Sequence, residues 1–504
     1  MSDTKQIWFV ETEIVYKEVL DHVITNLNRI HNVDLSKRFW DIFIGAWLRE
    51  FVELVMLRIN ECEHGQSHTT ESGKISPIIS LSDYRRLSQQ TDFVEGLRFD
   101  TWSAINRPCN SQPLSLNTPD PKVDTPQKAR LGRSYFSATY LNRKVEIALQ
   151  LGSRRIPRPL KIIGPPSSPF DESLRDALCK PRNDLSQKSK IVVSLFPKYL
   201  PIVYLESFNF LAATKKPWTG KKLPRVIFTS NRHLYDDVFN FWTAHAVEHG
   251  TKLVIGQHGG YYGISEFPSN FERHEFDIAD RYISWGWNTS GVSIAGPSLI
   301  LVNEHLIRRT NPQSLVVVTD HLVNHPRSLF GDISKTSPYL LNIQALINRI
   351  QHDSDSILIR IPKTNDDSHQ FQIDWFNTHL PQTTVDTGEL KFRILLKEAK
   401  LVVIPHNGTT LIESIALGVP TIIFWDKSIV WMRSEAEVVF NALEQVGIFH
   451  RTPESAASFI NSNWNDIDGW WNSPSTIDAR KQFTDRYART VSNPVRFLVK
   501  ALRF

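Results

Sequence analysis

A short polar loop near the middle of this chain, Gln257-His258-Gly259-Gly260, combines residue types that suit ligand contact and proton transfer. It directly follows an apolar run, and paired glycines let a backbone approach a ligand closely. The imidazole of His258 titrates near neutral pH and can serve as a base or as a donor. We therefore predict His258 and Gln257 as catalytic residues, and Gly259, Gly260 and Tyr261 as residues that line the same site.

A second polar loop follows the apolar run 401–404 and precedes a helical pattern that ends at Gly418. Its residues offer donors and backbone amides: His406, Asn407, Gly408, Thr409 and Thr410. We expect Thr409 or Thr410 to cap a helix from 411 to about 417, with Glu413 in the first turn. Amides at a helix start favour phosphate, and the loop lies at the carboxyl end of a strand, where open α/β sheets bind ligands. Glu413 could accept hydrogen bonds from a ribose, or only complement the helix dipole.

Further candidates lie in other loops of the second half and at the start of the chain. Arg360 and Lys363 flank a turn and suit the charge of a phosphate, although both could be surface cations beside that turn. His321 follows another apolar run. Glu11, after the apolar letters IWFV, is a candidate for the edge of the site.

The elements that must position these loops alternate between strands and helices. We expect strands over 190–196, 225–230, 252–255, 282–287, 314–319, 356–361, 401–404 and 421–425, and helices over 38–59, 235–249, 338–352, 389–398 and 411–417. The segment 296–313 contains Gly, Pro, Asn and Arg and marks a boundary between two such series. Alternation of this kind predicts doubly wound parallel sheets.

Composition and missing motifs exclude several classes of protein. The net charge of +5 is mild and no dense basic stripe is present, so we expect no nucleic-acid partner. Cys62, Cys109 and Cys179 are too far apart for a metal-ligand motif. GxxxxGK[ST], GxGxxG and GxSxG sequences are absent, and the DxD triplet 353–355 precedes a strand, so it is interpreted as a solvated turn. We expect no metal, no cofactor and, without a signal peptide or a spanning segment, a cytoplasmic location.

Four segments carry a resemblance to a known family: GTTLIESIALGVP, IGQHGGYYG, YISWGW and FIGAWLREF. The first resembles the donor side of glycosyltransferases of the GT-B architecture, which implies nucleotide-sugar contacts at Thr409, Thr410, Glu413, Gly418 and Pro420. The others are similar to a family of bacterial surface-carbohydrate transferases first catalogued in spirochaetes. The resemblance covers roughly 8–60 and 190–450, and the chain departs from ordinary donor sites at His406-Asn407.

Together these observations predict two Rossmann-like doubly wound α/β domains that face a cleft, with extra N-terminal helices and a C-terminal helical tail. The expected units are 1–300 on the acceptor side, 301–480 on the donor side, and a tail over 481–504. The resemblance implies metal-independent transfer of a hexosyl or ulosonic-acid group from a nucleotide-sugar donor to a saccharide or lipid-linked saccharide. Peripheral contact with the inner face of a membrane would fit the basic tail. Two alternatives remain: a polyol-phosphate transferase of the same fold, and a non-catalytic nucleotide-binding scaffold.

Overall fold

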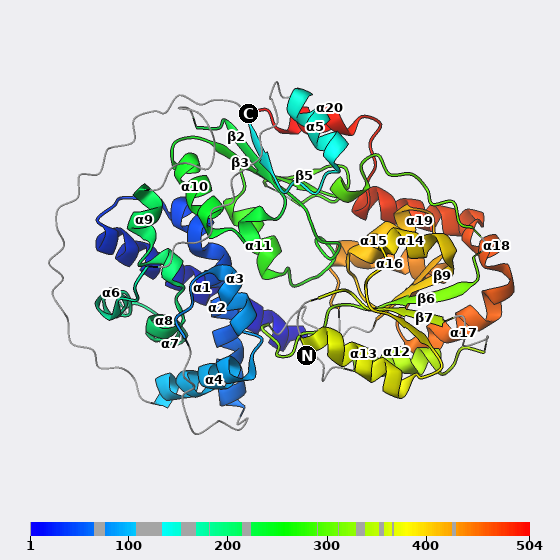
Figure 1. The fold of residues 1–504 in the computed structure, drawn as a ribbon, viewed down its shortest axis with the longest axis horizontal. Helices are drawn as coiled ribbons and strands as arrows, with labels where there is room; N and C mark the ends of the chain where they lie inside the picture. The colour runs from blue at the N-terminus through cyan, green and yellow to red at the C-terminus, as the bar shows by residue number, and fades with distance from the viewer. Residues whose placement is uncertain are drawn as a thin grey trace.

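The computed structural model describes most of the chain and shows two α/β units side by side (Figure 1). The described residues are 2–64, 76–106, 134–152, 168–180, 182–213, 223–289, 291–310, 312–328, 338–351, 357–364, 367–425 and 430–504. The DxD triplet lies outside them, as do most of the Ser- and Pro-rich stretches before residue 134.

The first sheet contains five parallel strands in the sequential order β1-β2-β3-β4-β5. They are β1 (Tyr135–Ser137), β2 (Val226–Thr229), β3 (Lys252–Gly256), β4 (Arg281–Ser284) and β5 (Ser293–Ala295). The strands are short apolar runs that are buried almost throughout, as expected for parallel strands covered on both faces. The strand predicted over 282–287 ends early at Ser284, and Gly286, at φ +129°, lies where a Cβ would meet the carbonyl of Asp485 at 2.7 Å.

The helices of the first unit lie outside this sheet, most of them in a thick layer on the left in Figure 1. They are α1 (Ser2–His31), α2 (Lys37–Glu63), α3 (Leu81–Leu87), α4 (Thr91–Asn106), α5 (Arg143–Gly152), α6 (Glu172–Leu178), α7 (Gln187–Ser194), α8 (Phe196–Tyr199), α9 (Phe208–Ala213), α10 (Asp237–Glu248) and α11 (Asn270–Ile278). The predicted helix over 38–59 is α2, which Ser36 caps by accepting from the Phe39 N–H. It is buried along nearly its whole length and packs against α1, α10 and α11. Helix α2 is therefore a core element.

One predicted strand is wrong. The apolar run 190–196 forms α7 and the start of α8 instead. Ser186 caps α7 by accepting from the Ser189 N–H, and helical geometry buries Ile191, Val192 and Val193 against α1, α2 and α4. A short apolar run does not distinguish a buried strand from a buried helix, and the packing against these helices decides it here.

The second sheet contains six parallel strands in the order β11-β10-β9-β6-β7-β8. They are β6 (Ser314–Val318), β7 (Ile357–Arg360), β8 (Thr384–Asp386), β9 (Ala399–Ile404), β10 (Thr421–Phe424) and β11 (Phe449–His450). The chain starts in the middle, moves to one edge, and returns to the other side of β6, which is the doubly wound order. The expected α/β class is confirmed: the chain has two parallel sheets and additional N-terminal helices, but only the second sheet is doubly wound, whereas the strands of the first follow chain order.

The helices of the second unit connect and cover its strands. They are α12 (Tyr339–Ile347), α13 (Asp367–His379), α14 (Phe392–Glu398), α15 (Thr409–Ala416), α16 (Ser434–Gln445), α17 (Pro453–Asn463) and α18 (Ile467–Trp471). One face of this sheet shares an apolar core with the first unit, and the other face has a core of its own. The two units are thus joined by continuous packing.

The last two helices connect the two units. Helix α19 (Pro474–Tyr487) packs on α15 and α16, after which the chain crosses back to the first sheet. Helix α20 (Pro494–Ala501) packs on α5, and the side chain of Arg281 in β4 donates to the carbonyl of Arg503 at 3.1 Å. Figure 1 shows α20 and α5 together above the first sheet. The tail therefore packs back on the first unit.

Candidate functional site

The second sheet reverses its winding between β6 and β9, and two predicted loops lie at this switch point. His406 follows β9 and Asp320 follows β6, with their side chains 3.6 Å apart (Nδ1 to Oδ2). The backbone N–H of His321 donates to Asp320, and the Gly408 N–H donates to Nδ1 of His406 at 3.0 Å. Burial lowers the pKa of His406, against the pull of the Asp320 charge. His406 therefore acts as a neutral acceptor that holds the shape of its own loop.

Helix α15 begins at the end of this loop, two residues earlier than predicted. Gly408 is its N-cap, so no side chain caps the helix and the expected threonine cap is wrong. The first amides of a helix have no carbonyl partner within it. The hydroxyl oxygen of Thr410 is buried without a hydrogen-bond partner. The start of α15 thus offers unpaired donors at the switch point.

The earlier start of α15 moves Glu413 into the second turn. Its carboxylate lies 3.4 Å from Nε of Arg393, which also pairs with Glu304 and donates to the carbonyl of Ile300. Burial raises the pKa of Glu413, and Arg393 opposes this shift. Glu413 is therefore held at the segment that links the two sheets.

In the first unit, the loop after β3 is fixed by Gln257. The buried Gln257 side-chain oxygen accepts from the backbone N–H of Trp285 and from the indole N–H of Trp287, both at 2.8 Å. Its amide nitrogen donates to the carbonyl of Gly259 at 2.8 Å. Through these contacts the YISWGW segment holds the loop after β3 in place. They favour a positioning role for Gln257.

The two predicted loops meet each other directly. The Gly260 N–H donates to the hydroxyl of Thr409 at 3.1 Å, and the Asn407 amide approaches the hydroxyl of Ser265 at 3.4 Å. A Cβ added to Gly260 would lie 2.7 Å from the carbonyl carbon and oxygen of Gly408. The close approach of the two backbones therefore requires glycine at this position. Its φ does not, because Gly260 is not in the left-handed region.

His258 points into a buried polar cluster behind this junction. Its Nδ1 lies 3.3 Å from Oε1 of Glu275 on α11, and the Tyr262 hydroxyl lies 3.2 Å from both its Nε2 and the same carboxylate oxygen. Nε2 of His233, after β2, lies 3.1 Å from that oxygen as well. One fully buried carboxyl group thus joins two imidazoles and a phenol.

Burial controls the charge state of this cluster. It lowers the pKa of His258 to about 4, with a further contribution from the charge of Arg85. It also lowers the pKa of His233 well below the ordinary value and raises the pKa of Glu275 well above it. Burial therefore disfavours the charged form of all three groups, and a neutral His258 keeps a ring nitrogen that can accept a proton.

Sequence analysis missed Glu275, His233 and Tyr140. The ring centroid of Tyr140 lies 6.0 Å from that of His258, and the backbone of Tyr140 has φ +61°. Such a backbone is uncommon for a bulky residue and is found at functional sites more often than elsewhere. Glu275 and His233 come from a helix and a loop far from the Gly-rich turn in sequence, and no local pattern marks them. Tyr140 follows a segment that is outside the described residues and has no motif either.

Other predicted residues lie elsewhere. Glu11 pairs with Lys188 of α7 at 2.9 Å, on the outer helices. Arg360 pairs with Asp386 and donates to the carbonyl of Gly388, while Lys363 pairs with Glu389 at 2.9 Å. Arg360 is the last residue of β7 and Lys363 follows that strand, which is separated from β9 by β6. A phosphate would have to compete with these carboxylates, and a phosphate role for the two cations stays a prediction.

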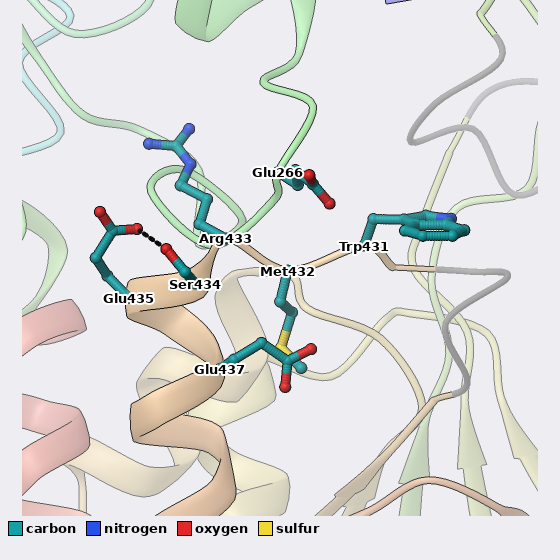
Figure 2. A pocket seen from close by; sticks show the side chains of 7 residues that line it. All are labelled: Glu266, Trp431, Met432, Arg433, Ser434, Glu435 and Glu437. Carbon is teal, nitrogen blue, oxygen red and sulfur yellow. Dashed lines mark hydrogen bonds between the residues drawn. The ribbon is translucent and has the colours of Figure 1, made fainter. Parts of the chain in front are cut away.

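A pocket of about 520 Å³ lies along the same junction between the units (Figure 2). It forms where Ser265 and Met432 make an antiparallel bridge. Ser265 is also the residue that contacts the Asn407 amide. Its lining residues are Glu266, Trp431, Met432, Arg433, Ser434, Glu435 and Glu437. The Arg433 guanidinium is occupied by Glu272 and the Ser265 carbonyl, which leaves the pocket with an excess of carboxylates. This acidic lining does not favour an anion.

No cluster of three His, Cys, Asp or Glu side chains in the described ranges could hold a metal ion. None of the helices in that part of the chain has the length and apolarity needed to cross a bilayer.

Comparison with solved structures gives distant similarities. The spinosyn rhamnosyltransferase SpnG with spinosyn aglycone is 12% identical, over 55% of this chain and 73% of that one, with a TM-score of 0.30. A UDP-N-acetylglucosamine 2-epimerase is 10% identical over 70% and 94% of the two chains, with a TM-score of 0.35. The wall teichoic acid polymerase TagF is 12% identical over 55% and 80%, with a TM-score of 0.32.

Comparison with curated proteins gives no match. A family model, in contrast, matches residues 7–106 and 121–502, which is most of the chain and includes both loops of the junction. The chain belongs to the LIC12162 family of transferases.

Proposed function

We propose that this transferase moves a glycosyl group from a nucleotide-activated donor to a saccharide or lipid-linked saccharide, without a metal ion. The second unit would bind the donor and the first the acceptor, on the cytoplasmic side of a membrane. The observation that carries the proposal is the direct contact between the His258 loop and the start of α15, through Gly260 and Thr409.

The donor side rests on the start of α15. Ligands of doubly wound sheets bind at the switch point, and the free amides and the dipole of a helix N-terminus favour phosphate. Thr410 adds a buried hydroxyl without a partner. A donor diphosphate would satisfy these groups, and its nucleoside would extend over the second sheet.

The acceptor side rests on His258 and Glu275. In the proposed reaction an acceptor hydroxyl attacks the anomeric carbon, the bond from that carbon to the phosphate oxygen breaks, and His258 takes the hydroxyl proton. The negative charge on the leaving phosphate would be stabilised at the amides of α15. Both ring nitrogens of His258 now face protein partners, so the acceptor must take the place of the Tyr262 hydroxyl at Nε2.

The test begins with nucleotide binding. We would measure thermal unfolding with UDP, GDP, dTDP, ADP, CDP and CMP, first without metal and then with magnesium. A nucleotide at about 100 times its Kd stabilises by about 2.7 kcal/mol, and the one that does so identifies the class of donor. A shift that requires magnesium would refute metal independence, and the absence of any shift would refute the donor site.

Variants then localise the site. Thr410→Val should weaken binding of that nucleotide about tenfold or more, because a hydrogen bond to a charged group contributes about 1.5–3 kcal/mol. The matched control is Thr378→Val, since Thr378 is an exposed residue of α13 that bonds only within its helix. Equal affinity of the two variants would place the nucleotide elsewhere. Donor hydrolysis by the wild type separates an enzyme from a scaffold, and an alditol phosphate product would indicate the polyol-phosphate reaction.

A further inference from the structure

The outer surface of the first unit carries a layer made of α5 and α20. The two helices pack against each other, and a Cβ on Gly152 would lie 3.1 Å from Cγ2 of Val499. Each buries one face in the core of the unit, through Val145 and Leu149 of α5 and through Leu498 and Ala501 of α20. The faces opposite to these are exposed.

The exposed face of α5 combines large apolar side chains with cations. Ile147 is 38% exposed and Leu151 is 60% exposed, four residues apart and therefore on one side of the helix. Arg143 and Lys144 are exposed on the same side. An exposed pair of large aliphatic side chains beside two cations differs from an ordinary solvated face, which is mainly polar.

Helix α20 extends this face with charge. Arg496 and Lys500 are exposed and four residues apart, opposite the buried Leu498. The carboxylate of Glu146, the acidic residue of α5, bonds Thr139 and Gln150 and is turned inward. The described residues of the two helices therefore present cations without an exposed acid.

The sequence from the start of α5 onward is more basic than the rest of the chain. Residues 143–163 contain six basic residues and one acidic residue, a balance equal to the net charge of +5 of the whole protein. The part of this segment after Gly152 lies outside the described residues and adds only its sequence charge. The remaining 483 residues are electrically balanced.

We propose that the α5–α20 face, defined by Arg143, Lys144, Ile147, Leu151, Arg496 and Lys500, binds the surface of an anionic lipid bilayer. Cations are attracted by anionic headgroups, and aliphatic side chains beside them enter the boundary between headgroups and acyl chains. A single strand of nucleic acid would call for aromatic side chains between the cations, which the exposed faces of these two helices do not supply.

The position of this face also suits the proposed function. Only this step of the inference depends on that function. Helix α5 begins three residues after Tyr140, whose ring approaches His258. A bilayer bound at α5 would lie on the side of the molecule from which the Tyr140 loop reaches the site. It would bring an acceptor carried on a lipid to the first unit and leave the second unit free to exchange nucleotides.

The test is binding of the full chain to vesicles, measured by cosedimentation without nucleotide. Vesicles of phosphatidylcholine alone are compared with vesicles that also contain phosphatidylglycerol, at low and high NaCl. The variant is Arg496→Glu/Lys500→Glu. Its control, Lys17→Glu/Lys391→Glu, changes the net charge equally at exposed positions on α1 and before α14. Removal of the two cations alone should lower the partition coefficient about thirtyfold, since each contributes about 1 kcal/mol near an anionic surface, and the two added carboxylates should lower it further.

We expect binding to the anionic vesicles that falls with salt, is lost in the α20 variant and is kept in the control. Leu151→Ser should weaken binding at high salt, where the apolar contribution remains. Equal binding of the two double variants, or none by the wild type, would overturn the proposal. Sedimentation velocity supplies a further check, because a dimer abolished by the α20 variant would assign the face to self-association. Vesicle binding and nucleotide binding are measured independently. A negative result with vesicles would therefore overturn the membrane proposal without affecting the proposed function, and a negative result with nucleotides would do the reverse.

Discussion

Gly260→Ala tests the contact between the two loops with a single methyl group. The added Cβ would lie 2.7 Å from the carbonyl carbon and oxygen of Gly408 and 2.8 Å from Cα of Thr409. Ordinary contact begins at 3.4 Å, so the two backbones must separate by about 0.7 Å. All three neighbours are backbone atoms, so no side chain can rotate away to make room.

The expected effects differ in size. Overpacking of this kind costs about 1–3 kcal/mol of stability. A displacement near 1 Å between reacting groups can lower turnover by about a hundredfold. We therefore expect a modest decrease in the midpoint of urea unfolding and a large decrease in kcat for the nucleotide sugar chosen by the binding panel.

The control is Gly250→Ala, at the other end of β3. A Cβ there meets nothing within 4 Å, but φ is +97°, so the variant loses about 1–3 kcal/mol through backbone strain alone. It should keep its turnover. If Gly260→Ala retained wild-type kcat while losing the same stability as Gly250→Ala, the junction would be structural and the reasoning would be refuted.

Three further variants address the cluster behind the junction. His258→Ala should decrease kcat about a hundredfold or more with little change in nucleotide Kd; equal losses of both would contradict a base. Because the pKa of His258 is about 4, this residue should cause no decrease in rate from pH 8 to pH 6, which a pH profile checks. Glu275→Gln should lower kcat, and its Tm should rise relative to the wild type as pH increases from the ordinary carboxyl pKa toward the raised pKa of Glu275, because the wild type loses stability over that range. A constant Tm difference would show that Glu275 does not titrate there. Gln257→Ala leaves the N–H groups of Trp285 and Trp287 unpaired and should cost about 2–6 kcal/mol in urea unfolding, at about 1–3 kcal/mol each.

The fold was predictable because its signals are local. Apolar runs of four to six residues at 252–256, 314–318 and 399–404 form parallel strands, and the alternation with helices is read along the chain. The loops after β3 and β9 were predicted for the same reason, since each glycine-containing turn directly follows such a run. The exception is α7, whose apolar letters fit either element and whose helix depends on packing against α1, α2 and α4.

The buried cluster was not predictable, because its members come from separate elements. Glu275 lies in the amphipathic helix α11, where an acidic residue normally faces solvent, and His233 lies in a short turn after β2. Only the fold brings them to His258. Burial then changes their chemistry, since it raises the pKa of the carboxyl group and lowers the pKa of the imidazoles, so that all of them are harder to charge than in solution.

Pairing also weakens the case for the two cations that were predicted to bind phosphate. Arg360 and Lys363 each have a carboxylate partner 26 residues further along the chain, Asp386 and Glu389, and the sequence shows the cations without showing that they are paired. At Gly408 the opposite holds: the residue has no side chain that could compete for the first amides of α15, and its carbonyl takes only the Leu411 N–H, at 3.2 Å. An anion gains more from donors that lack a partner than from cations that would first have to leave one. The helix start, with the buried hydroxyl of Thr410, is therefore the stronger candidate for the donor phosphate.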